Sequence, residues 1–268
     1  MHYGKEMTNT EALEKTLGEL YAAQLAYDNL ASKLKTLRNI SPENKTEISG
    51  LENLCWNMGI KIKLLKRMRM YYGNMTEYYP DIYYSKRHTG MRRWEKKLGY
   101  YMADLFSVQS MIDFGCALGS YMEGVIEYGA DPVDGIEILY EKALPYIPEE
   151  IKNRISQGDI GQPMQFKRKY DCSFSIEVAE HLPEELADNF VDNLIKSSSR
   201  LIVVSASNRG GHYHINQKQK DYWIGKFAIK GCRYSSDDTE RLINIWKSKG
   251  CPGYIQHNLM VFWTEKYA

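Results

Sequence analysis

The stretch Met111-Ile112-Asp113-Phe114-Gly115-Cys116-Ala117-Leu118-Gly119-Ser120-Tyr121 contains the most informative pattern in this chain. Its first four residues are typical of a buried β-strand, its middle contains two glycines, and a helical pattern follows. A glycine-containing turn between a strand and a helix lets a ligand approach the backbone and meet the helix N-terminus. The spacing is Gly-x-x-x-Gly, with Ala117 where a dinucleotide-binding turn would carry another glycine. This motif is weakly specific unless the neighbouring segments support it.

Short β-rich runs alternate with amphipathic helical segments on both sides of this turn. The expected strands are 110–114, 133–138, 155–158, 172–176, 201–205 and 259–264, and two clear helices are expected at 184–196 and 239–249. Such alternation indicates a mostly parallel sheet with helices on both faces. The strand at 259–264 follows the last helix, so we expect an antiparallel edge or insertion there. The predicted fold class is therefore α/β, with a doubly wound, mostly parallel sheet.

Polar residues fall at the carboxyl ends of the expected strands, where open α/β sheets bind ligands. Asp113 ends the first strand, and Glu137 follows 24 residues later at the end of the second. An acid at that place can accept both hydroxyl groups of a ribose. Asp159 and Ile160 follow the third strand, where they could contact an adenine amino group and its ring.

Together these motifs resemble those of the class I S-adenosylmethionine-dependent methyltransferases, in the ubiquinone- and sugar-methyltransferase-like branch. The matching segments are 113–119, Glu137, 158–160 and 170–182, and the last contains Glu177-Val178-Ala179-Glu180-His181-Leu182. The resemblance extends from about residue 83 to the C-terminus and implies a Rossmann-like fold with S-adenosylmethionine as cofactor. Ala117 departs from the family pattern, which has glycine at this position.

The resemblance also implies a set of cofactor-binding residues, all at or just beyond strand ends. In this set Asp113 orients the methionine amino group, Gly115, Ala117 and Gly119 bring the backbone close to the cofactor, Glu137 binds the ribose, Asp159 and Ile160 flank the adenine, and Ser175 and Ile176 line the methionine side.

Methyl transfer from a sulfonium requires aligned reactants and removal of a proton from the acceptor. His181 is the first candidate base, because imidazole titrates near neutral pH and this position faces the pocket in the resembled branch. His214 is the second candidate, in the Gly-, His- and Asn-rich segment 205–216 after the fifth strand, where loops usually contact substrate. The alternative for His181 is a purely structural role.

The same residues allow a second interpretation, in which a metal takes part. Glu177, Glu180 and His181, with His212 or His214, form a set of carboxylates and imidazoles that suits a divalent ion such as Mg²⁺ or Mn²⁺. A Glu-x-x-Glu-His with a later His resembles the metal-dependent small-RNA 2′-O-methyltransferases. The pentapeptide also occurs in branches that do not act on RNA, so a divalent metal is not favoured and its ligands stay unknown.

Residues 1–80 are expected to form a helical extension, and residues 81–268 the methyltransferase domain. Leu13, Leu17, Leu20 and Tyr27 begin an apolar stripe at helical spacing, and Ser41-Pro42 separates a second helix at about 43–70. We expect a helical hairpin that covers the domain as a lid or forms a homodimer contact.

Charge is unevenly distributed along the 268 residues. Lys and Arg number 35 against 34 Asp and Glu, yet residues 1–100 carry +6 (17 basic, 11 acidic) and residues 101–268 carry −5 (18 basic, 23 acidic). The interval 61–97 holds eleven basic residues and three acids among tyrosines and a tryptophan. Basic groups interleaved with aromatic rings can hold phosphates and stack bases, so RNA is an alternative partner to a solvated cationic surface.

The remaining composition restricts the class of protein. No apolar run approaches the roughly 20 residues that cross a bilayer, and the five cysteines form no CxxC pair. We therefore expect a cytoplasmic enzyme without a membrane segment, which methylates an oxygen or nitrogen of a small-molecule or glycan-type acceptor. Two alternatives stay open: a metal-assisted RNA 2′-O-methyltransferase, and a non-catalytic methyltransferase-like binding subunit, which only Ala117 supports.

Overall fold

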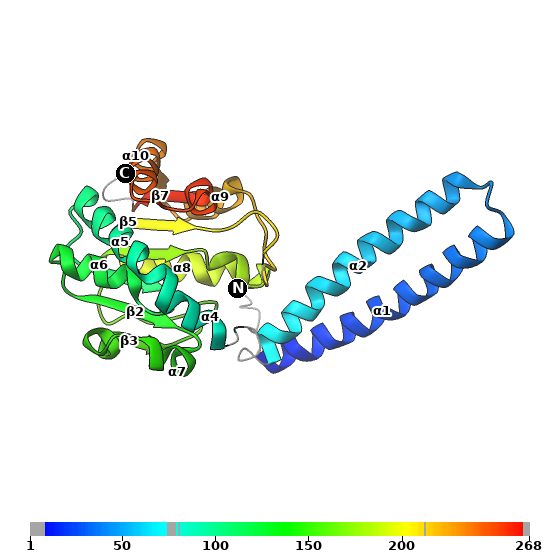
Figure 1. The fold of residues 1–268 in the computed structure, drawn as a ribbon, viewed down its shortest axis with the longest axis horizontal. Helices are drawn as coiled ribbons and strands as arrows, with labels where there is room; N and C mark the ends of the chain where they lie inside the picture. The colour runs from blue at the N-terminus through cyan, green and yellow to red at the C-terminus, as the bar shows by residue number, and fades with distance from the viewer. Residues whose placement is uncertain (1–8, 74–78, 80, 212, 265–268) are drawn as a thin grey trace, which may run out of the picture. The chain divides into compact units, whose positions relative to one another are not determined.

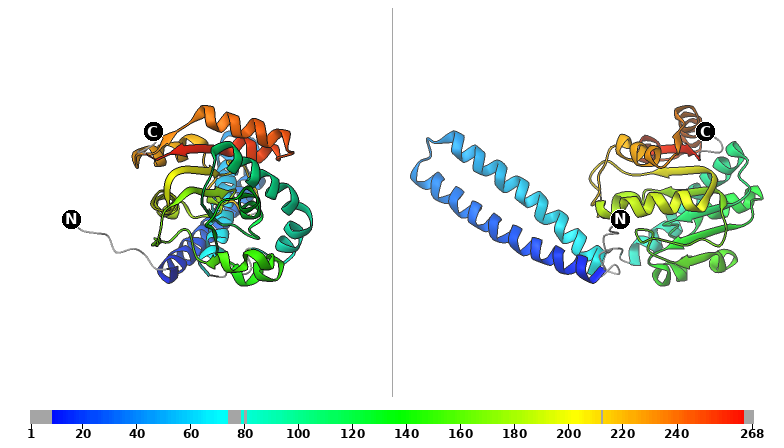
Figure 2. Two further views of the ribbon diagram at one scale, coloured as in Figure 1. Left: turned by 90° about the vertical axis from the view of Figure 1, so that its left-hand side faces the viewer. Right: turned by 180° about the vertical axis from the view of Figure 1, so that it is seen from behind.

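A computed structural model describes residues 9–73, 79, 81–211 and 213–264. The chain divides into two compact units, which we call the hairpin unit (residues 1–78) and the α/β unit (residues 79–268). Figure 1 and Figure 2 show the two helices of the hairpin unit and the sheet of the α/β unit. No helix in the described part of the chain is both long enough and apolar enough to cross a membrane.

The hairpin unit consists of helices α1 (Asn9–Ile40) and α2 (Lys45–Gly73). Both helices were predicted, and their contact is built from small and medium apolar side chains. This cluster comprises Ala23, Ile62 and Leu65, with Leu20, Tyr27, Met58 and Met68 packed against it. Leu17 of the predicted stripe is exposed, because Thr16 is the residue that turns inward at this level.

The α/β unit contains a seven-stranded sheet with the strand order β3-β2-β1-β4-β5-β7-β6. The strands are β1 (Met111–Phe114), β2 (Val133–Glu137), β3 (Ile155–Gln157), β4 (Tyr170–Ile176), β5 (Ser198–Ser205), β6 (Arg233–Tyr234) and β7 (Leu259–Trp263). Strands β1 to β5 pair in parallel, and β7 runs antiparallel to both β5 and β6. The predicted mostly parallel sheet is confirmed, and the predicted late strand, β7, is inserted between β5 and β6. Strand β6 has only two residues, and the sequence did not predict it.

Helices connect and flank these strands. They are α4 (Asp81–Lys86), the π-helical turn η1 (Arg87–Met91), α5 (Arg92–Phe106), α6 (Ser120–Tyr128), α7 (Tyr140–Ala143), α8 (Ala187–Ser197), α9 (Lys220–Ile229), α10 (Ser236–Ser248) and α11 (Gly253–Asn258), with short 3₁₀ turns η2 (Leu144–Tyr146), η3 (Glu149–Arg154), η4 (Ala179–His181) and η5 (Glu184–Leu186). Helix α5 packs on α6 and α10, and α8 packs on α9. The Trp246 indole joins α10 to α5 by donating to the Leu98 carbonyl at 3.0 Å, and it stacks on Tyr121 of α6.

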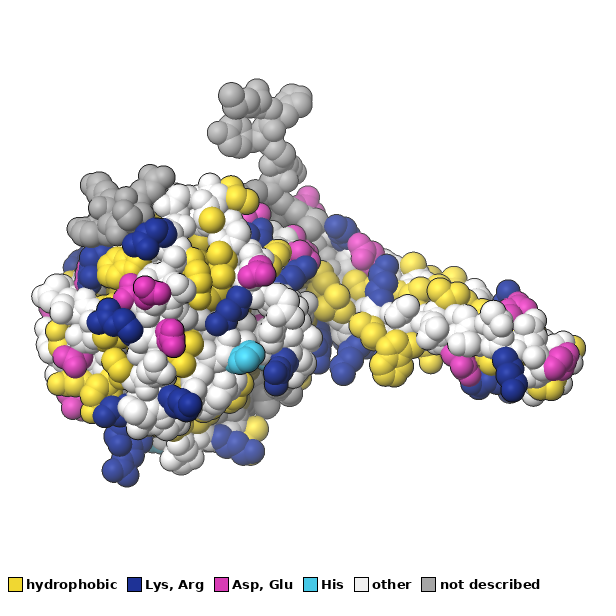
Figure 3. Space-filling view, turned by 90° about the horizontal axis from the view of Figure 1, so that it is seen from above, with side chains coloured by type: hydrophobic (Ala, Val, Ile, Leu, Met, Phe, Trp, Pro, Cys, Tyr) yellow, Lys and Arg dark blue, Asp and Glu magenta, His cyan; other side chains and the backbone are white. Residues whose placement is uncertain are grey.

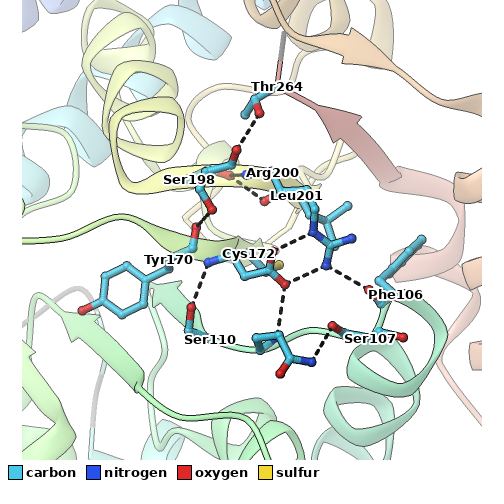
Figure 4. A network of polar contacts seen from close by, with 12 residues as sticks. Phe106, Ser107, Ser110, Tyr170, Cys172, Ser198, Arg200, Leu201 and Thr264 are labelled. Atoms are coloured by element: carbon cyan, nitrogen blue, oxygen red, sulfur yellow. Dashed lines mark hydrogen bonds and ion pairs between the residues drawn. The ribbon is translucent and has the colours of Figure 1, made fainter. Parts of the chain in front are cut away.

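A dense polar network holds the amino ends of β4 and β5 (Figure 4). Arg200 donates from Nε and Nη2 to the two carboxylate oxygens of Asp171, at 2.6 Å each, and Nη2 also donates to the Phe106 carbonyl at 2.9 Å. The Gln109 amide adds a bond to Asp171 Oδ2 at 3.1 Å. This paired arrangement gives geometric specificity as well as energy, and it fixes the edge of the sheet that lies opposite the candidate site.

Candidate functional site

The turn after β1 adopts the left-handed conformation at three positions. The φ angles are 74° at Gly115, 49° at Ala117 and 71° at Gly119. The amides of Gly115 and Cys116 both donate to the Ile136 carbonyl, at 2.8 and 3.1 Å, which ties the turn to β2. A left-handed alanine costs roughly 1–2 kcal/mol relative to glycine. The Ala117 amide donates to Glu137 Oε2 at 2.9 Å, and this charge-assisted bond offsets that cost.

Glu137 closes β2 and is buried against this turn. Its carboxylate accepts hydrogen bonds from the amides of Ala117 and Leu139 and from the Tyr84 hydroxyl, at 2.9, 3.1 and 3.2 Å. Burial raises the pKa of Glu137, and the two amides and the hydroxyl oppose that rise. The turn and the predicted ribose-binding acid therefore form one hydrogen-bonded assembly, to which Tyr84 adds a partner that the sequence did not single out.

Asp113 lies at the end of β1 and is only 2% exposed. Its Oδ2 atom has no hydrogen-bond partner among the described residues. Burial raises the pKa of Asp113 well above the ordinary range, and Glu95 adds to this, while the Arg87 charge opposes it. A buried carboxylate oxygen with no protein donor suits a ligand ammonium group, so this position fits the methionine end of S-adenosylmethionine.

The other predicted cofactor residues lie near the same edge of the sheet. Asp159 follows β3 and accepts the Gly161 amide at 2.9 Å, and Ile160 is buried beside it. Ser175 of β4 is buried and donates to the Phe114 carbonyl at 2.9 Å, which links β4 to β1, and Ile176 is half-buried. The side chain of Ser175 therefore makes a strand-to-strand bond.

A cavity of about 540 Å³ opens at the carboxyl ends of β4 and β5, formed by residues of the α/β unit. Four segments contribute its walls: Tyr79, Tyr83, Arg87 and Met91 before α5; Glu177, Glu180 and His181 after β4; Ser207, Arg209, Gly210 and His214 after β5; and Gly253, Tyr254, His257 and Asn258 of α11. The structure thus brings both predicted bases, His181 and His214, to one cavity.

Two imidazoles and one carboxylate converge in this cavity. The rings of His181 and His214 are 4.9 Å apart and perpendicular, and His214 Nε2 lies 3.9 Å from Glu180 Oε1. Atoms able to bind a metal, one from each of these three residues, lie within 4.8 Å of one another. His212, the other histidine considered, lies outside the described residues.

Glu180 is fully buried, and neither of its carboxylate oxygens has a hydrogen bond of normal geometry in the described part of the chain. Burial raises the pKa of Glu180 well above the ordinary range, and the nearby Glu177 carboxylate raises it further. An orphaned buried carboxylate next to two imidazoles fits a divalent cation, so Glu180, His181 and His214 are the residues that would hold one.

Glu177 stands at the cavity wall in a strained conformation, with a φ of 56°. The Ser205 hydroxyl accepts its amide at 2.9 Å and donates to its Oε1 at 2.8 Å, and Asn258 donates to the same oxygen at 3.3 Å. Left-handed non-glycine residues cost about 1–3 kcal/mol and cluster at functional sites. These three bonds hold the carboxylate beside Glu180.

Arg87 is a site residue that the sequence did not single out. It lies in the π-helical turn η1, a feature frequent at functional sites. Its guanidinium pairs with the buried Glu95, donates to the Tyr83 hydroxyl at 3.0 Å, and lines the cavity. Its charge also opposes the rise in the pKa of Asp113.

Part of the predicted cationic surface is neutralised by acids. Arg92 makes a bidentate pair with Glu123 at 2.7 and 2.6 Å, and Lys96 pairs with Glu127 at 2.8 Å. With Arg87 bound to Glu95, three cations of the interval 61–97 therefore make ion pairs within the α/β unit.

No protein-family model and no curated protein matches this chain. Among solved structures it is similar to S-adenosylmethionine-bound CalS10, an amino pentose methyltransferase from Micromonospora echinaspora, with a TM-score of 0.50, 11% identity, and 69% of this chain and 97% of that chain covered. Streptomyces venezuelae DesVI matches with a TM-score of 0.49, 14% identity and coverage of 69% and 95%. The methyltransferase domain of bacterial CtHen1 matches with a TM-score of 0.43, 22% identity and coverage of 63% and 98%. The α/β unit has the Rossmann-like fold of the class I methyltransferases, as predicted.

Proposed function

We propose that this chain is an S-adenosylmethionine-dependent methyltransferase that acts on an oxygen or nitrogen of a small-molecule or glycan-type acceptor. The observation that carries the proposal is the hydrogen-bonded assembly of the left-handed turn and Glu137, with the buried Asp113 directly before the turn, beside a cavity that contains two histidines. Tyr83 and Tyr84 join the two parts, since Tyr84 binds Glu137 and Tyr83 lines the cavity.

The residues of the assembly divide the work of cofactor binding. Asp113 offers a carboxylate oxygen to an ammonium group, Glu137 offers oxygens to two hydroxyls, and the turn offers backbone at close range. When bound, S-adenosylmethionine supplies an activated methyl group on a sulfonium. Arg87 lines the cavity, where its positive charge can meet a carboxylate of the cofactor or acceptor.

The cavity supports an acceptor of modest size. Its volume of about 540 Å³ lies within the range of roughly 300–1,000 Å³ that holds small ligands. Tyr79, Tyr83 and Tyr254 supply aromatic surface and hydroxyl groups. His181 and His214 make contacts from Nδ1 to the backbone carbonyls of Tyr213 and Arg209, at 3.3 and 2.8 Å. A ring held in this way presents Nε2 as its basic nitrogen, which is the atom to accept the acceptor's proton.

Calorimetry with S-adenosylmethionine and S-adenosylhomocysteine tests the cofactor. Glu137→Ala removes a charged hydrogen-bonding group, so we expect at least about a tenfold loss of affinity, from the 1.5–3 kcal/mol typical of such bonds. Asp104→Ala, at an exposed carboxylate of α5, is the matched control and should bind normally. Absence of binding by the unaltered protein at millimolar ligand contradicts the proposal.

The second candidate function is metal-assisted RNA 2′-O-methylation, favoured specifically by the cluster of Glu180, His181 and His214. A bound divalent ion would supply a Lewis acid that orients a hydroxyl group. Metal analysis of the purified protein and RNA binding at several salt concentrations test this candidate, because phosphate contacts release counterions. Full activity with a chelator, together with no salt-dependent RNA binding, eliminates it.

The non-catalytic alternative loses its only support in the sequence. Ala117 adopts the same left-handed conformation as the flanking glycines and donates to Glu137. Alanine at this position therefore does not prevent the cofactor-binding turn from forming.

A further inference from the structure

Glu137, the acid proposed to bind the ribose, is already engaged by three donors of the protein. Its Oε1 atom accepts the Leu139 amide at 3.1 Å and the Tyr84 hydroxyl at 3.2 Å, and its Oε2 atom accepts the Ala117 amide at 2.9 Å. Only 6% of Glu137 is exposed. The buried carboxylate therefore holds three hydrogen bonds before any ligand reaches it.

The capacity of a carboxylate for hydrogen bonds limits what else Glu137 can bind. A carboxylate accepts bonds at about four lone-pair positions. Three of these are taken in Glu137, and a ribose that binds through both of its hydroxyl groups needs two. On the proposed function, in which Glu137 accepts both hydroxyl groups of S-adenosylmethionine, one protein donor must therefore give way when the cofactor binds.

The two backbone donors to Glu137 are fixed in place. The Ala117 amide belongs to the left-handed turn, which two further amides tie to the Ile136 carbonyl at 2.8 and 3.1 Å. The Leu139 amide lies only two residues beyond Glu137, so its bond closes a short loop of backbone. Withdrawal of either amide would require a rearrangement of the turn or of the end of β2.

The Tyr84 hydroxyl is the donor that can leave. Tyr84 lies in the six-residue helix α4, 53 positions before Glu137, and it makes this bond with its side chain alone. Burial and the Glu137 charge raise the pKa of the hydroxyl, so it stays protonated and remains a donor at neutral pH. A movement of this one side chain breaks the bond without loss of a backbone hydrogen bond.

We propose that the Tyr84 hydroxyl takes the place of a ribose hydroxyl group on Glu137 in the cofactor-free protein and is displaced when the cofactor binds. A buried carboxylate with too few donors is costly, so the bond stabilises the cofactor-free site. Because the same bond is broken on binding, it opposes binding. Tyr84 therefore lowers the affinity for ligands that carry both ribose hydroxyl groups.

Two contacts hold the segment around Tyr84 independently of its hydroxyl. The Lys142 ammonium group donates to the Tyr79 carbonyl at 3.0 Å, and His88 Nδ1 lies 3.1 Å from the Tyr146 carbonyl. Both contacts join the chain before α5 to the chain that follows β2. The displacement is therefore a local change at one side chain, and the segment keeps its place in the wall of the cavity.

Calorimetry of the full chain with S-adenosylhomocysteine tests the proposal. Tyr84→Phe keeps the ring and removes the hydroxyl, so it should bind this ligand about tenfold more tightly than the unaltered protein, because the displaced bond is one to a charged group. The 2′,3′-dideoxy analogue of the ligand lacks both ribose hydroxyl groups, so the two proteins should bind it equally. A purely structural role of Tyr84 would change both affinities alike.

The matched control is Tyr170→Phe, which removes a hydroxyl that donates to Asp134 near the amino ends of β4 and β2. It loses the same type of bond as Tyr84→Phe, and its affinity for S-adenosylhomocysteine should be normal. Circular dichroism checks that each variant is folded. Hydrophobic side chains lie exposed along the hairpin unit (Figure 3), so sedimentation velocity checks that the variants do not differ in self-association.

Two results would contradict the role of Tyr84 and leave the cofactor assignment intact. One is equal or weaker binding of S-adenosylhomocysteine by Tyr84→Phe, and the other is an equal gain in affinity for the dideoxy analogue. Absence of binding by both proteins at millimolar ligand has a different meaning, because it overturns the proposed function and the role of Tyr84 together.

Discussion

Strand β4 has a carboxylate near each end, half-buried at the amino end and fully buried beyond the carboxyl end, and the two have opposite surroundings. At the amino end, Asp171 receives two bonds from Arg200 and one from the Gln109 amide. Beyond the carboxyl end, Glu180 is fully buried with no hydrogen bond of normal geometry among the described residues. A buried polar group without partners destabilises the fold and marks a functional site. The amino end is therefore organised for stability, whereas the carboxyl end carries the proposed binding site.

The same contrast extends across the sheet. Asp113 ends β1 on the carboxyl side and also has an oxygen without a partner, whereas Arg200 at the amino side donates to two different groups. Burial and neighbouring acids raise the pKa of both Asp113 and Glu180. Perturbed carboxylates gather at the edge where α/β sheets bind ligands.

The largest effect is expected at the carboxyl end, on turnover. His181→Ala removes a proposed base, so the rate of S-adenosylhomocysteine formation with acceptor should fall by about 10²–10⁴-fold, the usual contribution of general base catalysis. His214→Ala should act in the same direction. Affinity for S-adenosylmethionine should stay nearly constant in both variants. His88→Ala, at an exposed histidine bonded to the Tyr146 carbonyl, is the control. Normal turnover in both variants would exclude the two histidines as bases.

At the amino end the effect should appear in stability alone. Arg200→Leu leaves the half-buried Asp171 carboxylate and the Phe106 carbonyl without this donor, so the free energy of unfolding should fall by about 1–3 kcal/mol, the cost of removing hydrogen bonds to a charged group. Urea denaturation measures this change, and cofactor affinity of the folded variant should be normal. Lys226→Leu breaks the pair with the largely exposed Asp188 and should cost less than about 1 kcal/mol. Equal losses in the two variants would contradict the distinction.

Asp113→Asn should change how stability depends on pH. Because the pKa of Asp113 is raised in the folded state, the folded protein binds this proton more tightly than the unfolded protein does. This contribution to stability is present at acid pH and is lost as the pH rises through the raised pKa. An asparagine does not deprotonate, so the cofactor-free variant keeps its stability as the pH rises. Near pH 7 it should be more stable than the unaltered protein by about 1–3 kcal/mol, the cost of an unsatisfied buried group.

Urea denaturation of the variant and the unaltered protein between pH 5 and 8 measures this difference in stability. Parallel curves would show that Asp113 does not titrate in the expected direction. The same variant should bind S-adenosylmethionine more weakly, since the amide replaces the proposed partner of an ammonium group.

The smallest effect is expected where a bond at the carboxyl end is structural. Ser205→Ala removes the hydroxyl that bonds both the amide and the carboxylate of Glu177, so stability should fall by about 1 kcal/mol. Thr264→Val, which removes an exposed bond to the Ser199 carbonyl, is a control with a smaller expected loss. Thermal unfolding of the two variants ranks them, and the reverse order would contradict the burial argument.

Much of the fold could be predicted from short-range patterns. The β-rich runs, the glycine turn and the late strand at 259–264 are local features, and each corresponds to an observed element. The two-residue strand β6 is too short for any periodicity to reveal it. The leucine spacing predicts Leu17 on the inner side of α1, whereas the buried residues of this part of the helix are Ala12, Thr16 and Ala23.

The candidate site was predicted less completely, because its contacts join distant residues. Tyr84 meets Glu137 across 53 positions in the chain, and Arg87 meets Glu95 through a π-helical turn that no sequence pattern announced. His181 and His214 were both named as bases, yet only the folded chain brings their rings within 4.9 Å of each other.

Local sequence was enough to place strands, the turn and the acids at strand ends, because hydrophobic periodicity and backbone preferences act over a few residues. It singles out Asp113 by its place before the glycine turn, but it does not show which carboxylates have hydrogen-bond donors around them. Only the tertiary structure brings Arg200 to Asp171 from 29 positions away, while the Asp113 Oδ2 atom has no partner in the described residues. Whether a buried carboxylate stabilises this protein or binds a ligand depends on such long-range partners, because its free energy is set by the donors around it.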